Sequence, residues 1–189
     1  MPIAIGQKLE SDFRNPLGLL RDCHRRIERF LDGLIAISEE AQGKKLDDTQ
    51  SQLFKAGLRY FREAAPKHTL DEEESLFPRL RSKQADESRA TFALLDSLNA
   101  DHGEAEIKHK MVDELGCAWI AEGGLAPDST RTLTSLLREL RTTYEKHIAA
   151  EDNMVFPLAG RVLDASELEI IASEMAARRG IFFNGRPSQ

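Results

Sequence analysis

Apolar residues recur every three or four positions along almost the whole chain, which is the spacing that places them on one face of an α-helix. This pattern predicts four long helices. The first begins near Pro16, and the second begins near Asp47 to Thr49, any of which can cap it. The third carries the apolar stripe from Leu95 to Val112, and the fourth follows Asp128 or Ser129 as its cap.

Local breaks in the pattern separate these helices. The stretch SKQADES at residues 82–88 is predicted to be a loop, and Gly123-Gly124 followed by Pro127 is a stop signal for the third helix. Ser166 and Glu169 fit a capping box that opens a short fifth helix, which ends in the sequence RRG at residues 178–180.

Pro66 is the one local conflict, because it lies inside the second helix. A proline there is expected to kink the helix or to remove a backbone hydrogen bond. The kink either serves a nearby site or marks the place where two helical segments meet, and the sequence leaves both alternatives open.

Short connections between long helices predict antiparallel neighbours, and therefore an all-α fold. We expect an up-down-up-down antiparallel four-helix bundle with a short extra C-terminal helix. Residues 1–14 would form an N-terminal arm, residues 15–160 the bundle, and residues 161–189 the short helix and a tail.

The composition excludes several classes of function. Of the 189 residues, 41% are hydrophobic and 31% are charged, as in an ordinary globular protein. The net charge of −6 argues against nucleic acid as a partner. The sequence shows no basic amphipathic stretch, no apolar run of roughly 18 residues and no secretion signal, so no membrane partner is expected. Cys23 and Cys117 form no CxxC pair, which favours a reduced cytoplasmic protein.

Two stretches of the chain repeat one frame of residues. The first His–Glu segment is HTLDEEESLFP, from His68 to Pro78, and the second is HIAAEDNMVFP, from His147 to Pro157. Each has a glutamate four residues after its histidine, a further acid next to it, and a Phe-Pro ending that is predicted to mark where the segment leaves the bundle.

The repeat extends to the other two long helices. His24 precedes His68 by 44 positions, and His102 precedes His147 by 45. Glu28 and Glu106 each follow their histidine by four. A bundle built this way would have a pseudo-twofold axis, with four histidines and two glutamates at one depth in its core.

Such a cluster predicts a metal site. A lone histidine on an apolar stripe is usually a core residue with one hydrogen bond, but four at matching depth would each need a partner in a dry interior. A carboxylate four residues on lies about 40° round the helix and one turn along, so it reaches the same centre. No Lys or Arg on these stripes neutralises the two carboxylates, whereas metal cations would. The predicted ligands are His24, His68, Glu72, His102, His147 and Glu151.

The ligand types narrow the choice of metal. Imidazole and carboxylate without thiolate suit iron, manganese or zinc, and six such ligands suit a dinuclear centre. Ferritin-like bundles use paired Glu-x-x-His elements instead. Only one such element is present, from Glu106 to His109, so that class of site is excluded.

The order His, His-x-x-x-Glu, His, His-x-x-x-Glu resembles the hemerythrin family, specifically the bacterial hemerythrin-like proteins with an HHE cation-binding domain. The resemblance spans about residues 15–160. It implies two non-haem iron ions, with manganese or zinc as alternatives, and with Glu72 and Glu151 bridging them.

The chain departs from the oxygen-carrying members of that family at one position. Those proteins have a fifth histidine ligand four residues after the one on the third helix, and here that residue is Glu106. Three roles are open for Glu106: a metal ligand, a partner of an imidazole, or a solvated residue. The last two are also the alternatives for Glu28.

Tyr144 points into the same core, where it could bind a bridging oxygen, line a channel or simply pack. His109 lies roughly 10 Å along the helix from His102, so a core role is expected.

We therefore predict a di-iron protein that binds, stores or senses O₂, NO or peroxide. The alternative is an iron-handling or stress-response enzyme, which would donate iron to damaged iron centres or turn over peroxide or NO. Relatives that repair iron–sulfur centres commonly carry a cysteine-bearing N-terminal domain, for which there is no room before Pro16. A third alternative is a structural bundle with zinc or no metal. A sensor of this kind would act as a homodimer or through a separate signalling partner.

Overall fold

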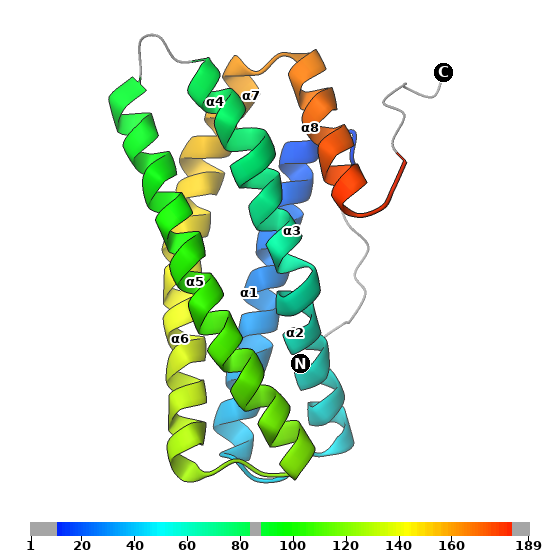
Figure 1. Cartoon of the computed structure of the whole chain (residues 1–189), viewed down its shortest axis with the longest axis vertical. Helices are drawn as coiled ribbons and strands as arrows, with labels where there is room; N and C mark the ends of the chain where they lie inside the picture. The colour runs from blue at the N-terminus through cyan, green and yellow to red at the C-terminus, as the bar shows by residue number, and fades with distance from the viewer. Residues whose placement is uncertain (1–10, 84–87, 183–189) are drawn as a thin grey trace. The chain divides into compact units, whose positions relative to one another are not determined.

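In a computed structural model of the protein, the described residues are 11–83 and 88–182. They are helical apart from short connections, and no strand occurs among them, which confirms the all-α prediction. The helices are α1 (Pro16–Ala41), α2 (Asp48–Glu63), α3 (Ala65–Leu70), η1 (Asp71–Leu76), α4 (Phe77–Ser82), α5 (Ser88–Glu122), α6 (Pro127–Ala150), η2 (Glu151–Val155), α7 (Phe156–Val162) and α8 (Ala165–Arg178), as Figure 1 shows. The elements η1 and η2 are π-helical, and the others are α-helical.

The helix starts are partly as predicted. Asp47 caps α2, because its side chain accepts from the backbone of Gln50 while the Gln50 side chain accepts from the backbone of Asp47. The capping box of α8 was placed two residues too late, since the pair is Asp164 and Glu167. The predicted caps of the fourth helix were also wrong, because that helix already begins at Pro127, whose fixed φ suits the first helical position.

The second predicted helix is divided at Pro66. α2 ends at Glu63, and α3 begins at Ala65 with Pro66 in its first turn, where a missing N–H breaks no helical hydrogen bond. Of the two alternatives for Pro66, the structure shows the meeting of two helical segments. The third helix ends at Glu122 before Gly123, which has a φ of 70°, as the stop signal predicted. Most of the predicted loop at 82–88 lies outside the described residues.

Both Phe-Pro endings differ from the prediction. Phe77 and Phe156 are each 1% exposed and begin the helices α4 and α7, so neither segment leaves the protein core there. Proline at the second position of a helix needs no hydrogen-bond partner, which explains why the helical path continues through both Phe-Pro pairs.

The chain divides into two compact units. Unit 1 comprises Met1–Arg25, Pro66–Ala100 and Ile148–Gln189, and unit 2 comprises Arg26–Ala65 and Asp101–His147. None of the helices in the described part of the chain has the length and apolar character that crossing a membrane requires.

Unit 2 contains four helical stretches, from α1, α2, α5 and α6, with a tightly packed apolar interior. Phe54 and Trp119 contact each other edge to face with ring centroids 5.3 Å apart, and both are 0% exposed. A Cβ added to Gly116 would lie 2.9 Å from the Phe54 ring, so only glycine allows α5 to approach α2 this closely. The Leu125 backbone N–H donates to the Gly43 carbonyl, which joins the two loops of this unit.

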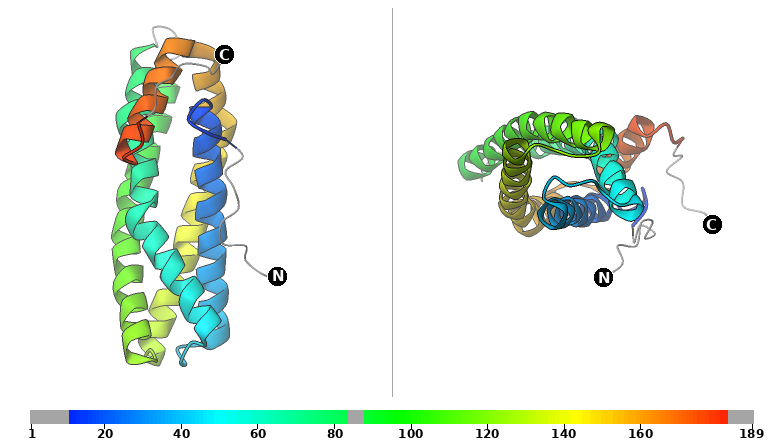
Figure 2. Two further views of the ribbon diagram at one scale, coloured as in Figure 1. Left: turned by 90° about the vertical axis from the view of Figure 1, so that its right-hand side faces the viewer. Right: turned by 90° about the horizontal axis from the view of Figure 1, so that it is seen from below.

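Unit 1 has its own hydrophobic core, to which α8 contributes. Ile171 and Met175 of α8 are 0% exposed, because they pack into the cluster formed by the other helical segments of the unit. α8 lies beside η1, as Figure 2 shows. The core of unit 1 consists of Leu19, Leu20, Leu76, Phe77, Leu80, Leu95, Leu98, Val155, Phe156, Leu158, Ala159, Leu163, Ile171 and Met175.

Candidate metal centre

Four of the six predicted ligands lie together in unit 1. They are His24 on α1, His68 on α3, Glu72 on η1 and Glu151 on η2, and their ligand atoms all lie within 4.8 Å of one another. His24 Nε2 is 3.0 Å from Glu151 Oε2 and 3.7 Å from Glu72 Oε1, and His68 Nε2 is 3.3 Å from Glu72 Oε1. The structure therefore brings together four of the residues that the sequence predicts as metal ligands.

The backbone changes its winding where the two glutamates occur. Glu72 is the second residue of η1, and Glu151 is the first residue of η2. A π-helical turn contains an additional residue, and such turns occur often at functional sites. Both glutamates are 0% exposed, so the widened turns hold their carboxylates entirely inside the protein.

Two buried carboxylates require a positive charge nearby, because burying an uncompensated anion is costly. Burial lowers the pKa of His24, but its hydrogen bonds with Asp152, Glu151 and Glu72 outweigh this effect and raise the pKa well above its ordinary value. The cluster thus attracts a cation, either a proton on His24 or a metal ion bound by the same atoms.

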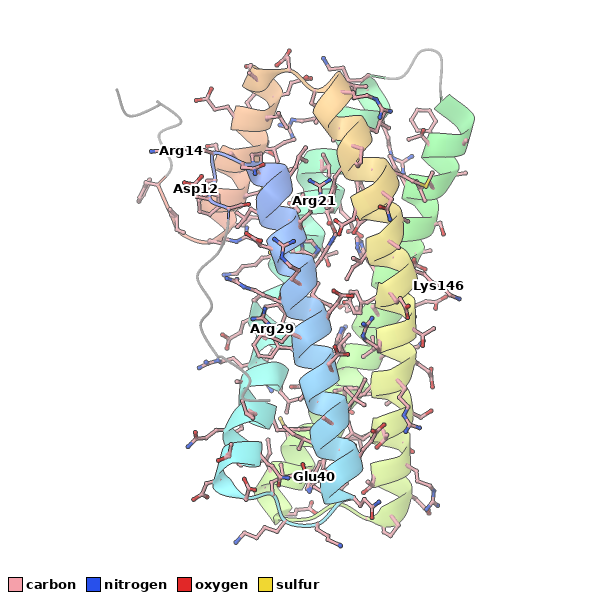
Figure 3. All side chains as sticks on the ribbon, turned by 180° about the vertical axis from the view of Figure 1, so that it is seen from behind. Asp12, Arg14, Arg21, Arg29, Glu40 and Lys146 are labelled. Carbon is pink, nitrogen blue, oxygen red and sulfur yellow. The ribbon has the colours of Figure 1, made fainter. Side chains whose placement is uncertain are left out.

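A further carboxylate supports His24 from its other side. Asp152 Oδ1 lies 3.1 Å from His24 Nδ1, and Arg21, labelled on α1 in Figure 3, lies 3.6 Å from the same oxygen. Phe156 stacks on the His24 ring with centroids 5.3 Å apart. A proton on Nδ1, shared with Asp152, leaves Nε2 free to bind a metal ion, which is the usual arrangement around metal-binding histidines. Asp152, the acid next to Glu151 in the second segment, is therefore a partner of an imidazole.

The other two predicted ligands form a close pair in unit 2. His102 Nε2 lies 3.1 Å from His147 Nε2, and both side chains are buried. Asp101 Oδ2 lies 3.3 Å from His147 Nδ1, so this histidine also has a carboxylate behind it. Sequence reasoning missed Asp101, because it precedes His102 in the chain and no spacing rule connects it with His147.

Among the remaining candidates, the two glutamates lie beside cationic side chains, whereas Tyr144 contacts the ring of His147. Glu106 forms an ion pair with Lys110 at 2.7 Å and has a 67% exposed side chain, and Glu28 lies 3.6 Å from Arg141. Both positions fit the solvated alternative. The Tyr144 hydroxyl lies 3.2 Å from His109 Nε2, and the centroid of the Tyr144 ring lies 6.3 Å from the centroid of the His147 ring.

His109 is a core histidine, as the sequence predicted. Its ring stacks on Phe61 with centroids 4.4 Å apart, and Tyr144 contacts its Nε2. Burial lowers its pKa to about 4, so the ring is neutral at physiological pH.

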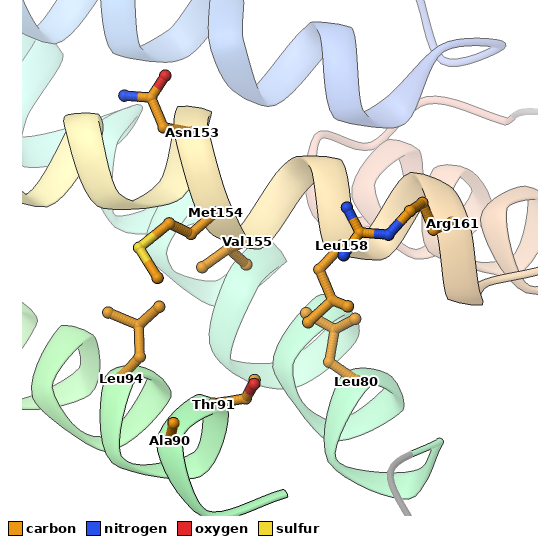
Figure 4. Close-up of a pocket in the computed structure, with 9 residues that line it drawn as sticks. All are labelled: Leu80, Ala90, Thr91, Leu94, Asn153, Met154, Val155, Leu158 and Arg161. Carbon is orange, nitrogen blue, oxygen red and sulfur yellow. The ribbon is translucent and has the colours of Figure 1, made fainter. Parts of the chain in front are cut away.

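Unit 1 also contains a hollow that the predicted ligands do not line. This hollow of about 310 Å³ lies among α4, α5, η2 and α7, with Asn153 and Arg161 at opposite ends, as Figure 4 shows. Its walls are largely apolar and include none of the predicted ligands. The four clustered residues of this unit are buried, each at most 4% exposed.

The donor set fits a metal ion. Two imidazoles and two carboxylates whose ligand atoms lie within 4.8 Å of one another, with no thiolate among them, suit iron, manganese or zinc. The carboxylates are fully buried, and a cation would neutralise them. These residues can therefore hold a metal ion, and the chemistry of the donors alone leaves its identity among these three.

Comparison with known proteins gives an independent indication of the same kind of site. The family model described as the hemerythrin HHE cation-binding domain matches residues 15–159, a range that contains all six predicted ligands. Among curated proteins, an uncharacterized protein of Haemophilus influenzae is 28% identical over 171 residues, which cover 89% of this chain and 92% of the relative.

Proposed function

The chain belongs to the hemerythrin HHE cation-binding domain family, and from this premise we propose that it is a non-haem di-iron protein that binds or senses O₂, NO or peroxide. The observation that carries the proposal is the buried cluster of His24, His68, Glu72 and Glu151. Within this family resemblance, iron is the metal we propose, in preference to manganese or zinc. We also propose a reducing cytoplasmic environment, since Cys23 and Cys117 are not joined by a disulfide.

The proposal assigns the two histidine groups to one dinuclear centre. Helical conformation is unbroken from residue 127 to residue 162, so His147 and Glu151 are one turn apart, as His68 and Glu72 are on the first segment. The repeat supports a matching role for the two segments. His24, His68, His102 and His147, together with Glu72 and Glu151, would hold the two iron ions.

This ligand count leaves room for a small molecule. Two imidazoles and shared carboxylates give each ion fewer donors than an octahedral site contains. The iron ions would supply the binding of the small molecule and the exchange of electrons with it. The chain supplies orientation through Asp152 and Asp101, and it excludes bulk water through the apolar residues that enclose the ligands.

The first test is the iron content of protein produced with iron supplied, measured beside His147→Ala and His109→Ala. We expect about two iron ions per chain in the parent and in His109→Ala, and a large loss in His147→Ala. Absence of iron from all three would overturn the proposal. Titration of the ferrous protein with O₂ and NO then separates reversible binding from consumption, because loss of iron in one oxidation cycle would contradict reversible binding.

A further inference from the structure

One carboxylate beside the candidate metal centre has partners that the proposed function does not use. Asp71 immediately precedes Glu72, is 0% exposed, and is contacted by two guanidinium groups at the C-terminal end of α8, those of Arg178 and of the capping residue Arg179. Arg179 binds it through both terminal nitrogens, with Nη2 at 2.6 Å from Oδ2 and Nη1 at 3.2 Å from Oδ1, and Arg178 Nη1 lies 3.0 Å from Oδ1. Paired contacts between arginine and a carboxylate fix direction as well as distance.

The same end of α8 is attached to η1 by further contacts. Arg178 Nη2 lies 3.1 Å from Glu74 Oε2, so this arginine bridges two acids of η1. Arg179 also donates to the Met175 carbonyl at 2.7 Å, which holds its guanidinium in place on α8. The π-helical turn that carries Glu72 is therefore tied to α8 on both sides of that residue.

The second His–Glu segment lacks this arrangement. The position that corresponds to Asp71 is Ala150, which has no charged side chain to offer. The repeat alone therefore does not require an acid here. An ion pair this deeply buried seldom adds much net stability, and such pairs can instead serve to specify one conformation.

We propose that Arg178 and Arg179 act as positioning residues, which hold Asp71 so that η1 keeps Glu72 directed at the metal and retards release of iron. This inference rests on the proposed function. Successive residues of a helix point about 100° apart, so a fixed Asp71 side chain also fixes the rotation of the turn that carries Glu72. Without the arginines, the wide turn of η1 could tighten to ordinary α-helical geometry, and the Glu72 carboxylate would move away from its place in the cluster.

The test compares Arg179→Ala, Arg179→Lys and a matched control, Glu174→Gln. The control weakens another contact of α8, the pair between Glu174 and Arg79, without touching Asp71. Full-length proteins loaded with iron are mixed with a chelator, and the rate of iron release and the absorption spectrum of the bound iron are recorded. The thermal midpoint of each metal-free protein is measured in parallel.

We expect Arg179→Ala to release iron several-fold faster, an effect smaller than the roughly 10-fold or greater change that is typical when a direct partner of a metal ligand is removed. Its spectrum should change, Arg179→Lys should lie between it and the parent, and Glu174→Gln should release iron at the parental rate. Equal acceleration in Arg179→Ala and Glu174→Gln would show a general effect of α8 attachment and would overturn the proposal, as would a parental rate in Arg179→Ala.

Two further outcomes are informative. If Arg179→Ala does not fold, Arg179→Lys decides: faster release at an unchanged midpoint supports the positioning role, and a parental rate overturns it. If the parent itself contains no iron, the proposed di-iron function fails and the positioning role fails with it. A parent with two iron ions and unaffected variants overturns the positioning role alone.

Discussion

The two His–Glu segments share a frame but differ in what supports their glutamates. In each, a histidine and a glutamate are one turn apart, the backbone is π-helical at the glutamate, and an α-helix begins at the phenylalanine of the Phe-Pro pair. The first segment is fixed from outside by α8, through Asp71. The second contributes its own acid, Asp152, to His24. The repeat thus accounts for the paired histidines and glutamates, whereas the supporting contacts differ between the two segments.

The largest expected effect concerns the ligand of the first segment. Glu72→Gln keeps the size of the side chain but removes the charge that a metal ion would neutralise. We expect the iron content per chain, measured by elemental analysis, to fall by half or more. Glu73→Gln is the matched control, because this neighbour is not among the clustered ligands, and it should retain the parental content. Equal iron contents in the two variants would remove Glu72 from the ligand set.

His109, the one histidine that is not a predicted ligand, should act on stability and not on metal binding. The pKa of His109 is about 4 in the folded protein because of burial, against about 6.5 in an unfolded chain. Between these values the unfolded state binds the proton and the folded state does not, so stability falls as the pH drops from about 6.5 to about 4. The full contribution is up to about 3 kcal/mol.

The measurement is the free energy of unfolding by urea at several pH values, for the metal-free parent and for His109→Gln. The variant lacks this titration, so its stability should decline less steeply over that range of pH. Identical slopes would show that His109 titrates normally in the folded protein. The difference between the two proteins cancels the contribution of His24, whose pKa is raised and whose effect has the opposite sign.

A feature of the fold or of the candidate site could be predicted from the sequence where it depends on residues close together in the chain. The helices, the break at Pro66 and the clustered ligands follow from apolar spacing and from the frame shared by His68 and His147, which are local properties. The π-helical turns have no comparable signal. Nor could the spacing show that Arg178 and Arg179, taken as a helix ending, contact Asp71, because that pairing depends on how α8 packs against η1.

The errors at helix starts have a similar cause. Ser166 with Glu169 and Asp164 with Glu167 satisfy the same capping rule, and only the path of the chain after α7 selects the second pair. At the fourth helix, the proline was counted as part of a stop signal for the preceding helix, although it also suits the first position of the next one. A proline such as Pro127 therefore fits both the end of one helix and the start of the next.

A smaller effect, on stability, is expected when the acid Asp71 of the first segment is introduced at the matching position of the second segment, Ala150. Ala150 is partly buried and packs against the core of unit 1, so Ala150→Asp places a carboxylate there without the arginines that accompany Asp71. The free energy of unfolding should fall by about 1–3 kcal/mol, the usual cost of an unpaired buried polar group. Ala149→Asp is the control at an exposed neighbouring position, where a change within about 0.5 kcal/mol is expected. Equal stabilities in urea unfolding would mean that the second segment accommodates the acid by itself.

The smallest expected effect concerns the contact between Asp152 and His24, which only the second segment provides. Asp152→Asn keeps an oxygen near His24 Nδ1 but loses the charge that favours a proton on that nitrogen, and with it the orientation of Nε2 toward the metal. Iron affinity in a competition with a chelator should fall about tenfold, the lower end of the range for such partners. Glu73→Gln, the same position of the first segment, should leave the affinity unchanged. If both variants bind iron as the parent does, the Asp152 contact has no part in metal binding, and His24 must be oriented by its packing against Phe156 instead.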